Sequence, residues 1–468
     1  MVVVDVINYK KMKKLILVLV LLNSVFSFAQ EKDSTKVFKK RVLESVEVDF
    51  LASYYQQEGT HSAVSGGIGS EKLTNVASNI VISIPLNEDD VLTVDAGISA
   101  YSSASSSNIN PYDNGEEEDI GNIATGKPTP WQASSGASSM DALVSLVANY
   151  SHSSDNRNFI WNTDVSFSNE YDYTSVGFGG GITKLFNNKN SEVSLKANAY
   201  IDQWRPIYPI EFRDFYSMSS YVYDQNGNHS TAYTNQFTPW TSTNRNSYSA
   251  SFGFSQVLTK KSQFSIFFDL LQQEGKLSTP YQRMYFADKA NFYVGDPQYI
   301  PVYSTTANKG AYQLADDIER LPNSRFKVPI GLRWNYYINE KMALRTYYRY
   351  YWDNWDITAH TASIELPYKI TDKFTVFPMY RYYAQKQSKY FAPFETHLST
   401  EEYYTSDYDL STFNANQYGF GVNYTDIFGT AKILGIAIKN IDFRFNHYDR
   451  SDGLSSNIAT IGIKFIEE

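Results

Sequence analysis

The chain has 468 residues, no cysteine and a formal net charge of -9. Its length suits several ordinary domains or one large barrel, and the lack of cysteine excludes disulfides, thiolate metal sites and a cysteine nucleophile. The acidic balance argues against nucleic acid as a partner. A mean hydropathy of -0.39 excludes a bundle of membrane helices but not a transmembrane β-barrel, whose apolar residues stand at alternate positions.

The N-terminal segment is typical of a secretory signal peptide. Four lysines between residues 10 and 14 precede an apolar run from Leu15 to Leu22, and Ser27-Phe28-Ala29 offers a small-x-small cleavage site. The apolar run is short for a transmembrane helix, so an uncleaved anchor is the weaker alternative. The predicted parts are a signal peptide at 1–29, a periplasmic N-terminal leader at 30–44 and an outer-membrane β-barrel at 45–468.

Alternation of apolar and polar residues continues along most of the mature chain, most clearly from Asn323 to Ala384. A period of two predicts strands with one apolar and one polar face, and the short polar turns between them predict antiparallel hairpins. Glycines at 177 and 179–181 predict a bend or a close backbone approach. The alternation places about sixteen strands, at 45–55, 76–84, 92–100, 141–150, 159–171, 176–186, 193–201, 248–254, 264–270, 326–336, 342–353, 364–366, 374–382, 418–424, 441–445 and 459–465.

The connections alternate in length, as they do in outer-membrane barrels. Connections after even-numbered strands are short, and long ones follow strands three, seven, nine and thirteen, at 102–139, 205–245, 274–322 and 386–411. Long loops outside and short turns inside place both termini in the periplasm. Aromatic residues near the strand ends resemble the two girdles of such barrels: Trp161, Phe186, Phe264 and Trp334 at inner ends, and Trp204 and Trp352 at outer ends.

Arginines at alternate positions of one strand fit a water-filled lumen better than the interior of a soluble protein, so a secreted soluble all-β protein is the weaker alternative. The sequence therefore predicts an all-β fold, a transmembrane antiparallel up-and-down β-barrel with long extracellular loops. We expect the charges on its polar faces to line a pore. The acids are Glu47, Asp49, Asp95, Asp141, Asp164 and Glu170, and the bases are Arg325, Lys327, Arg333, Arg345, Arg349 and Arg381.

These acids lie on strands one and three to five, and the bases lie on strands ten, eleven and thirteen. In a barrel of about sixteen strands the two sets should face each other across the lumen. In an open lumen the opposed charges would bias ion passage. Long loops folded inward would instead pair with the charges and close the pore.

Metal and catalytic motifs are weak. The acidic segment Asp113–Asp119 has oxygen ligands suited to Ca²⁺, but its spacing matches no known calcium loop and a solvated surface loop fits better. Asp224–Asn228 contains Asn-Gly and predicts a turn. The six histidines lack the spacing of a metal site, and no Gly-x-Ser-x-Gly elbow occurs. We predict no cofactor, no metal and no catalytic residue; a hydrolase with a site at the barrel rim is the least favoured hypothesis.

Three features resemble an uncharacterised Bacteroidota-type family of outer-membrane β-barrels, a domain of unknown function. They are the signal peptide ending in Phe-Ala-Gln, the tyrosine-rich strands, and the Pro-Trp…Ser-Gly-Ala-Ser segment within Thr129–Asp141. The resemblance covers the whole mature chain and implies a barrel in the outer membrane of a Gram-negative cell. Members of that family tend to occur near thioredoxin-like and flavin-transferase proteins, so the resemblance implies an extracytoplasmic redox system. It supplies no catalytic residues that could be carried over to this chain.

The sequence thus predicts a porin-like pore or transporter for small polar solutes or ions. The alternative is a non-conducting accessory or structural barrel that works with an extracytoplasmic, for example redox, system. The expected partners are outer-membrane lipid and periplasmic or surface proteins, with no nucleic acid.

Overall fold

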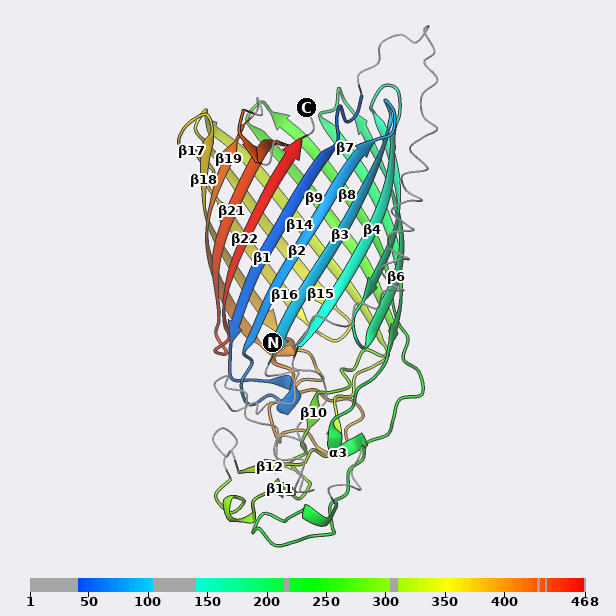
Figure 1. The fold of residues 1–468 in the computed structure, drawn as a ribbon, viewed down its shortest axis with the longest axis vertical. Coiled ribbons are helices and arrows are strands. Elements are labelled where there is room, and N and C mark those ends of the chain that lie inside the picture. Colours follow the sequence, from blue (N-terminus) through cyan, green and yellow to red (C-terminus); the bar gives the residue numbers. More distant parts are fainter. Residues whose placement is uncertain are drawn as a thin grey trace. The chain divides into compact units, whose positions relative to one another are not determined.

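Sixteen long antiparallel strands close into one barrel in the computed structural model (Figure 1). The structure describes residues 41–103, 140–213, 219–303, 310–426, 430–433 and 436–466. Closure is made by β1 (Glu47–Glu58) and β22 (Ser455–Ile466), which pair antiparallel along their whole length. A closed sheet has no open edge, so each wall strand has two hydrogen-bonded neighbours. The predicted all-β, up-and-down antiparallel barrel is confirmed.

The wall strands follow one another around the barrel in sequence order. After β1 come β2 (Leu73–Pro85), β3 (Asp90–Ser103), β4 (Met140–Ser153), β5 (Phe159–Asn169), β6 (Tyr173–Phe186), β7 (Ser191–Trp204), β8 (Arg245–Thr259) and β9 (Ser262–Gly275). They continue with β14 (Ser324–Asn339), β15 (Met342–Asp353), β16 (Thr358–Glu365), β18 (Phe374–Lys386), β19 (Phe413–Thr425) and β21 (Ile436–Arg450). In the described residues, the short strands β17 (Tyr368–Lys369) and β20 (Lys432–Ile433) bring the sheet to 18 strands. All predicted strands are present, and most extend beyond their predicted ends because backbone pairing continues where the apolar alternation fades.

The glycines of β6 permit the close approach that the sequence predicts. A Cβ atom on Gly177 would lie 2.2 Å from the hydroxyl oxygen of Ser166 and 2.7 Å from the ring of Tyr200. Ser166 and Tyr200 belong to the two neighbouring strands and stand directly opposite Gly177. The Tyr200 ring therefore occupies the space that a side chain at position 177 would need.

Apolar side chains cover the outer face of the wall. Val165 is 52% exposed and Phe178 is 55% exposed, and similar side chains repeat at alternate positions of the other wall strands. Rows of exposed apolar side chains on regular strands fit lipid surroundings. No helix within the described residues is both long enough and apolar enough to cross a membrane.

Four connections, as far as the structure describes them, fold together at one end of the barrel (Figure 1). We call the described residues of 59–72, 205–244, 276–323 and 387–412 the loop unit. Its short elements are η2 (Ala63–Ser65), α3 (Ile210–Arg213), η5 (Ser219–Tyr221), β10 (Arg283–Met284), β11 (Tyr293–Gly295), η6 (Pro297–Tyr299), β12 (Ala311–Gln313), β13 (Asp317–Ile318) and η7 (Tyr408–Leu410). Short turns such as 187–190, 260–261 and 340–341 occupy the other end. The predicted alternation of short and long connections is confirmed.

The loop unit has its own hydrophobic core. One cluster joins Val222 and Tyr233 of the 205–244 connection to Val294, Tyr312 and Leu314 of the 276–323 connection. Burial of each such side chain contributes about 1.5–3 kcal/mol, so the connections stabilise one another. Three further clusters consist of Leu277 and Leu321 with Trp355 of the 354–357 turn, of Met284, Phe286 and Tyr404, and of Tyr293, Ile300 and Ala311.

Candidate functional site

The inner face of the barrel is identified by an ion pair that reaches across intervening strands. Arg444 on β21 donates to Glu365 on β16 at 2.9 Å, although β18 and β19 lie between these two strands. Side chains of separated strands converge only on the concave side of a barrel wall, so both side chains point inward. The Arg444 guanidinium also lies 5.1 Å from the centre of the Phe377 ring on β18. The polar positions of these strands therefore face the lumen.

A charge network occupies the inner face in the half of the wall nearer the short turns. Glu365 accepts hydrogen bonds from Arg345 at 2.8 Å and from Arg444 at 2.9 Å, and Arg444 also donates to Asp442 at 2.9 Å. The Arg345 side chain remains 50% exposed, and the inward Lys196 remains 51% exposed. Inward side chains that keep half of their surface accessible indicate space for water in this part of the lumen.

Two predicted acids belong to a second network beside the closure of the barrel. Glu47 accepts hydrogen bonds from Lys439 at 2.8 Å and from Lys464 at 2.9 Å, and Lys464 lies 3.4 Å from Asp49. Sequence reasoning missed both lysines, although Lys464 stands at a polar position of an alternating strand. The acids of β1 are thus neutralised by their own neighbours.

Arg333 and Arg349, two further predicted bases, lie against aromatic rings. The Arg333 guanidinium lies 5.3 Å from the Phe267 ring centre and 5.7 Å from the Tyr347 ring centre. Arg349 lies 5.8 Å from the ring centre of Tyr351. A ring face attracts a cation, so these contacts hold the guanidinium groups against the wall.

The remaining predicted bases stand on β14 and β18. At the loop end of β14, Arg325 donates to Asp353 at 2.6 Å and lies 4.3 Å from the Trp355 ring centre. Lys327 stands opposite Asp353 in the strand ladder, and Arg381 stands on β18 between β16 and β19.

The remaining predicted acids divide between the wall and the loop end. Asp95 accepts a hydrogen bond from Asn79 at 3.0 Å, and Asp164 lies 3.8 Å from Lys196. Asp141 and Glu170 lie together at the loop end of the barrel. Within the described residues no ion pair joins the predicted acids to the predicted bases. The ion pairs that Glu47, Asp164 and Arg345 form are with other residues nearby on the wall. That these twelve residues line a conducting pore stays a prediction.

Two polar chambers lie where the loop unit meets the wall. The first mouth chamber has a volume of about 420 Å³. Its polar and aromatic lining comprises Tyr55, Gln57, Tyr101, Tyr448 and Arg450 of the wall, and Glu71, Tyr281, Gln282, Asp407 and Asp409 of the loop unit. The second mouth chamber, of about 280 Å³, is lined by Tyr101, Asp141, Glu170, Tyr171, Asp172, Tyr173, Trp204, Ile207, Arg245 and Tyr281. Tyr101 and Tyr281 line both chambers, so they form the partition between them.

The second mouth chamber holds three acids close together. Tyr101 donates a hydrogen bond to Glu170, and the indole Nε1 of Trp204 donates to Asp172 at 2.9 Å. Burial raises the pKa of Glu170 and of Asp172, and the charge of Asp141 raises both further. Trp204 is only 7% exposed and points inward, so its assignment to an aromatic girdle was wrong. A strand position alone does not distinguish an aromatic residue facing lipid from one facing the lumen.

Buried acids adjoin the first mouth chamber. The Glu319 carboxylate accepts from the Thr279 N–H at 2.6 Å and from the Thr405 hydroxyl at 2.7 Å. Burial raises the pKa of Glu319 to about 8. Asp407 accepts from Gln282 Nε2 at 3.3 Å, and burial together with the charge of Asp409 raises its pKa as well. The loop sequence gave no signal for these acids, because they come from connections without periodicity.

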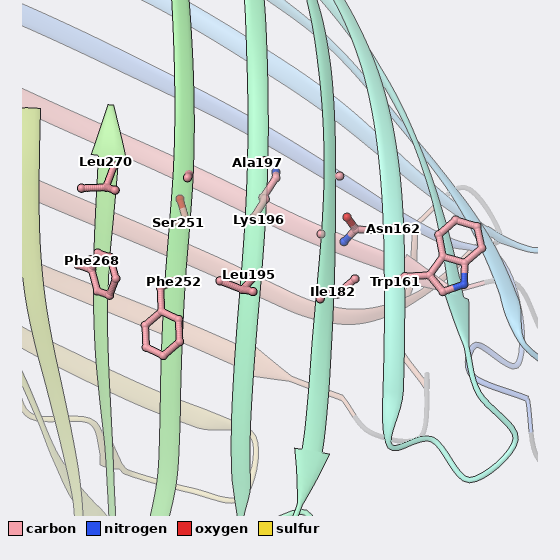
Figure 2. A pocket seen from close by; sticks show the side chains of 13 residues that line it. Trp161, Asn162, Ile182, Leu195, Lys196, Ala197, Ser251, Phe252, Phe268 and Leu270 are labelled. Atoms are coloured by element: carbon pink, nitrogen blue, oxygen red, sulfur yellow. The ribbon is translucent and has the colours of Figure 1, made fainter. Parts of the chain in front are cut away.

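A depression of about 620 Å³ crosses the outer face of β5 to β9 (Figure 2). Its floor is a row of small residues, because Gly180, Ala197 and Ala250 stand side by side on neighbouring strands. Trp161 and Phe252 are among the larger apolar side chains around it. The apolar residues of this lining alternate with inward polar ones such as Lys196, so the depression lies on the face turned to lipid.

Two other segments were singled out from the sequence, Asp224–Asn228 and Asp113–Asp119. Asp224 accepts from the N–H groups of Asn226 at 2.8 Å and Asn228 at 2.9 Å, and Gly227 has a φ of 78°, which confirms the predicted turn. The acidic segment Asp113–Asp119 lies outside the described residues. Across the described part of the chain no group of three or more histidine, aspartate or glutamate side chains has metal-binding geometry.

A closed antiparallel barrel with an even number of long strands, an apolar outer face, a polar inner face and short turns opposite long loops is an outer-membrane β-barrel. The chain belongs to the DUF3570 family, described as a protein of unknown function, and matches the family's sequence model over residues 17–458. Membership of a family without an assigned function, which the sequence led us to expect, is therefore confirmed.

Known proteins similar to this chain are found among solved structures, whereas no curated protein matches it. The chain is similar to a bacterial polysaccharide outer membrane secretin, with 8% identity and a TM-score of 0.43 over 91% of this chain and 99% of the other. It is also similar to a Pseudomonas aeruginosa FadL homologue, with 9% identity and a TM-score of 0.38 over 90% of each chain. A third is the outer membrane protein OpdK of Pseudomonas aeruginosa, with 7% identity and a TM-score of 0.35 over 91% of this chain and all of the other (100%).

Proposed function

We propose that this protein is an outer-membrane channel for small polar solutes, and that the loop unit narrows the channel at one end. The observation that carries the proposal is the polar path along the inner face. Charged side chains that remain half exposed line the short-turn half of the lumen, and two polar chambers lie at the loop end. A barrel of sixteen strands is wide enough to hold an aqueous channel.

Tyr281 is the residue that we expect to control the narrowing. It belongs to the 276–323 connection and lines both mouth chambers, so its ring stands between them. Removal of this ring should join the two chambers. Because Tyr281 lies outside the hydrophobic clusters of the loop unit, its truncation should leave the loop packing intact.

Planar-bilayer recording of the refolded mature protein tests the proposal. We expect a small conductance in the wild type and a larger one in Tyr281→Ala. The matched control is Tyr299→Ala, in the same connection, because Tyr299 is 45% exposed and lines neither chamber. The control should conduct like the wild type.

The second candidate function is a non-conducting accessory barrel that works with periplasmic or surface proteins, for example in an extracytoplasmic redox system. It is favoured by the rigidity of the loop unit, which has a hydrophobic core and a fully buried ion pair between Arg283 and Glu211. Absence of conductance in both the wild type and Tyr281→Ala would replace the channel by this function.

A further inference from the structure

Acidic side chains outnumber basic ones in the described lining of both mouth chambers. In the first chamber, Arg450 is bound by Asp409 at 2.5 Å and by Asp452, which is not part of the lining, also at 2.5 Å. Within the described residues no lysine or arginine forms an ion pair with Glu71 or Asp407. The arginine of the first chamber is therefore already neutralised, and two carboxyl groups there have no cationic partner.

The second chamber has the same imbalance. Its three acids, Asp141, Glu170 and Asp172, form no ion pair with any described lysine or arginine. The one basic side chain of its described lining, Arg245, lies 5.5 Å from the centre of the Trp204 ring instead. Both chambers are thus suited to attract a cation and to repel an anion.

Aromatic rings provide the second feature. Tyr55, Tyr101, Tyr281 and Tyr448 line the first chamber, and Trp204 joins tyrosines around the second. The faces of tyrosine and tryptophan rings attract ammonium groups, and more strongly where water is excluded. Rings combined with unpaired carboxylates are the chemistry that recognises an organic ammonium ion.

The loop unit already holds one side-chain amine against aromatic rings. The Lys276 side chain is 1% exposed, and its Nζ has no hydrogen-bond partner. The Nζ atom lies 4.3 Å from the centre of the Trp240 ring and 5.3 Å from that of Tyr208. Aromatic rings in this structure therefore surround a buried side-chain amine that makes no hydrogen bond.

Two groups beside the chambers still have unused hydrogen-bonding capacity. The Oε1 atom of Gln282 is buried and accepts no hydrogen bond, although its Nε2 donates to Asp407. The Tyr281 hydroxyl makes no hydrogen bond to any described residue. A buried acceptor without a donor costs about 1–3 kcal/mol, so a ligand that carries an N–H or O–H group would satisfy it.

From these observations we propose that the two mouth chambers form a binding site for a small organic cation that also carries a hydroxyl or amine donor. The proposal names the solute class of the channel and in that respect rests on the proposed function. The first chamber, at about 420 Å³, lies within the usual range of small-molecule pockets. Its size suits a single small cation and excludes a polymer.

Choline and its isosteres provide a direct test. Isothermal titration of the mature protein in detergent would compare choline with 3,3-dimethylbutan-1-ol, its uncharged isostere, and with 3,3-dimethylbutanoate, an anion of similar size. We expect choline to bind at least about tenfold more tightly than either. Equal binding of choline and the uncharged alcohol, or no binding of choline, would overturn the proposal.

Carboxamide variants locate the site. Glu71→Gln and Asp172→Asn keep the acceptor oxygens that bond His61 N and Trp204 Nε1, so they preserve the local structure. Each should weaken choline binding by about tenfold. Asp372→Asn is the matched control, because the Asp372 side chain is 99% exposed in a turn at the other end of the barrel. Unchanged binding in both chamber variants would show that choline binds elsewhere and overturn the assignment.

The two proposals fail separately. If choline binds but neither the wild type nor Tyr281→Ala conducts, the channel proposal is wrong and the binding-site proposal stands. If the protein conducts but does not bind choline, the binding-site proposal is wrong and the channel proposal stands. Circular dichroism and heat-dependent electrophoretic mobility would confirm that each variant forms the barrel.

Discussion

Arg283 and Glu211 form a two-point ion pair that is completely buried. Arg283 Nε donates to Glu211 Oε1 at 2.7 Å, and Nη2 donates to Oε2 at 3.2 Å. Arg283 Nη1 also donates to the Val64 carbonyl at 3.2 Å. One guanidinium group thus links the 59–72, 205–244 and 276–323 connections, so the pair joins most of the loop unit.

Loss of one partner of this pair should loosen the loop unit. Glu211→Gln leaves the Arg283 charge buried without a counter-charge, and such a change costs about 3–5 kcal/mol. We expect hydrogen exchange in 219–233 and 310–321 to accelerate while the wall strands keep their protection. The double variant Arg283→Met with Glu211→Leu should recover much of the loss, because an apolar pair replaces the charges. Unaltered loop exchange in Glu211→Gln would contradict this prediction.

The stability of the loop unit should fall as pH rises. Burial raises the pKa of Glu319 to about 8 and that of Asp316 to about 6. Carboxyl groups in an unfolded chain titrate near about 4, so the folded state retains protons that the unfolded state releases. The stabilisation is therefore complete below about pH 4 and is lost as pH rises through the two folded-state values, by at most about 1.4 kcal/mol per pH unit for each group.

Hydrogen exchange of the loop unit should be compared between about pH 5 and pH 6.5 to test this prediction. Burial lowers the pKa of Lys276 to about 7, and its contribution rises with pH above that value, which opposes the effect of Glu319. Below about pH 6.5, Lys276 is mostly protonated in both states, so the carboxyl groups dominate. Glu319→Gln keeps an acceptor oxygen for the Thr279 N–H and places an amide N–H₂ beside the Thr405 hydroxyl, which can accept from it, so the variant should flatten the pH dependence of loop exchange. A dependence as steep in this variant as in the wild type would exclude Glu319 as its source.

The strands of the barrel wall were predictable because what each strand needs can be recognised in its own sequence. A strand between lipid and water needs apolar and polar residues at alternate positions, so pairs such as Phe326 and Lys327 reveal the two faces without knowledge of any neighbour. The same signal was available for Lys464 and Asp442, whose inward position follows from the alternation. Those residues show that the separation of acids from bases around the lumen is less complete than the sequence-based set of charges implied.

The loop unit was not predictable by the same reasoning. Tyr233 and Val294 pack together across two connections, and neither belongs to a periodic segment. Their contact depends on many weak interactions that form only when both connections fold. Asp141 and Glu170 were assigned to the lumen from alternation, but their shared chamber with Tyr281 is defined by a connection whose path the sequence pattern does not contain.

The orientation in the membrane can be tested with small epitope tags. Asn226 lies in a long connection at the loop end, and Asn188 lies in the 187–190 turn at the other end. Long loops of such barrels face the exterior, so we expect a tag at Asn226 to be labelled on intact cells and a tag at Asn188 to be labelled only after the outer membrane is opened. A tag at Asn114 should behave like that at Asn226. The reverse pattern would place the termini outside.

Reversal of inward charge should change ion selectivity if the lumen conducts. Arg345 and Arg444 both donate to Glu365, and Arg349 stands one inward position along β15 from Tyr347. Arg345→Glu with Arg349→Glu removes two cations and places new carboxylates beside Glu365. The lumen then repels anions and attracts cations, so the reversal potential in a salt gradient should move toward that of the cation.

The matched control for this variant is Lys260→Glu with Lys261→Glu, which makes the same change in net charge in the exposed 260–261 turn. Interactions between exposed charges decay within about 10 Å at 0.1 M salt, so the control should shift the reversal potential much less than the lumenal variant. Equal shifts in the two variants would mean that the inner face of β15 does not line the ion path. An unshifted potential in a conducting lumenal variant would have the same meaning, and the path would then have to run along the wall strands on the other side of the barrel.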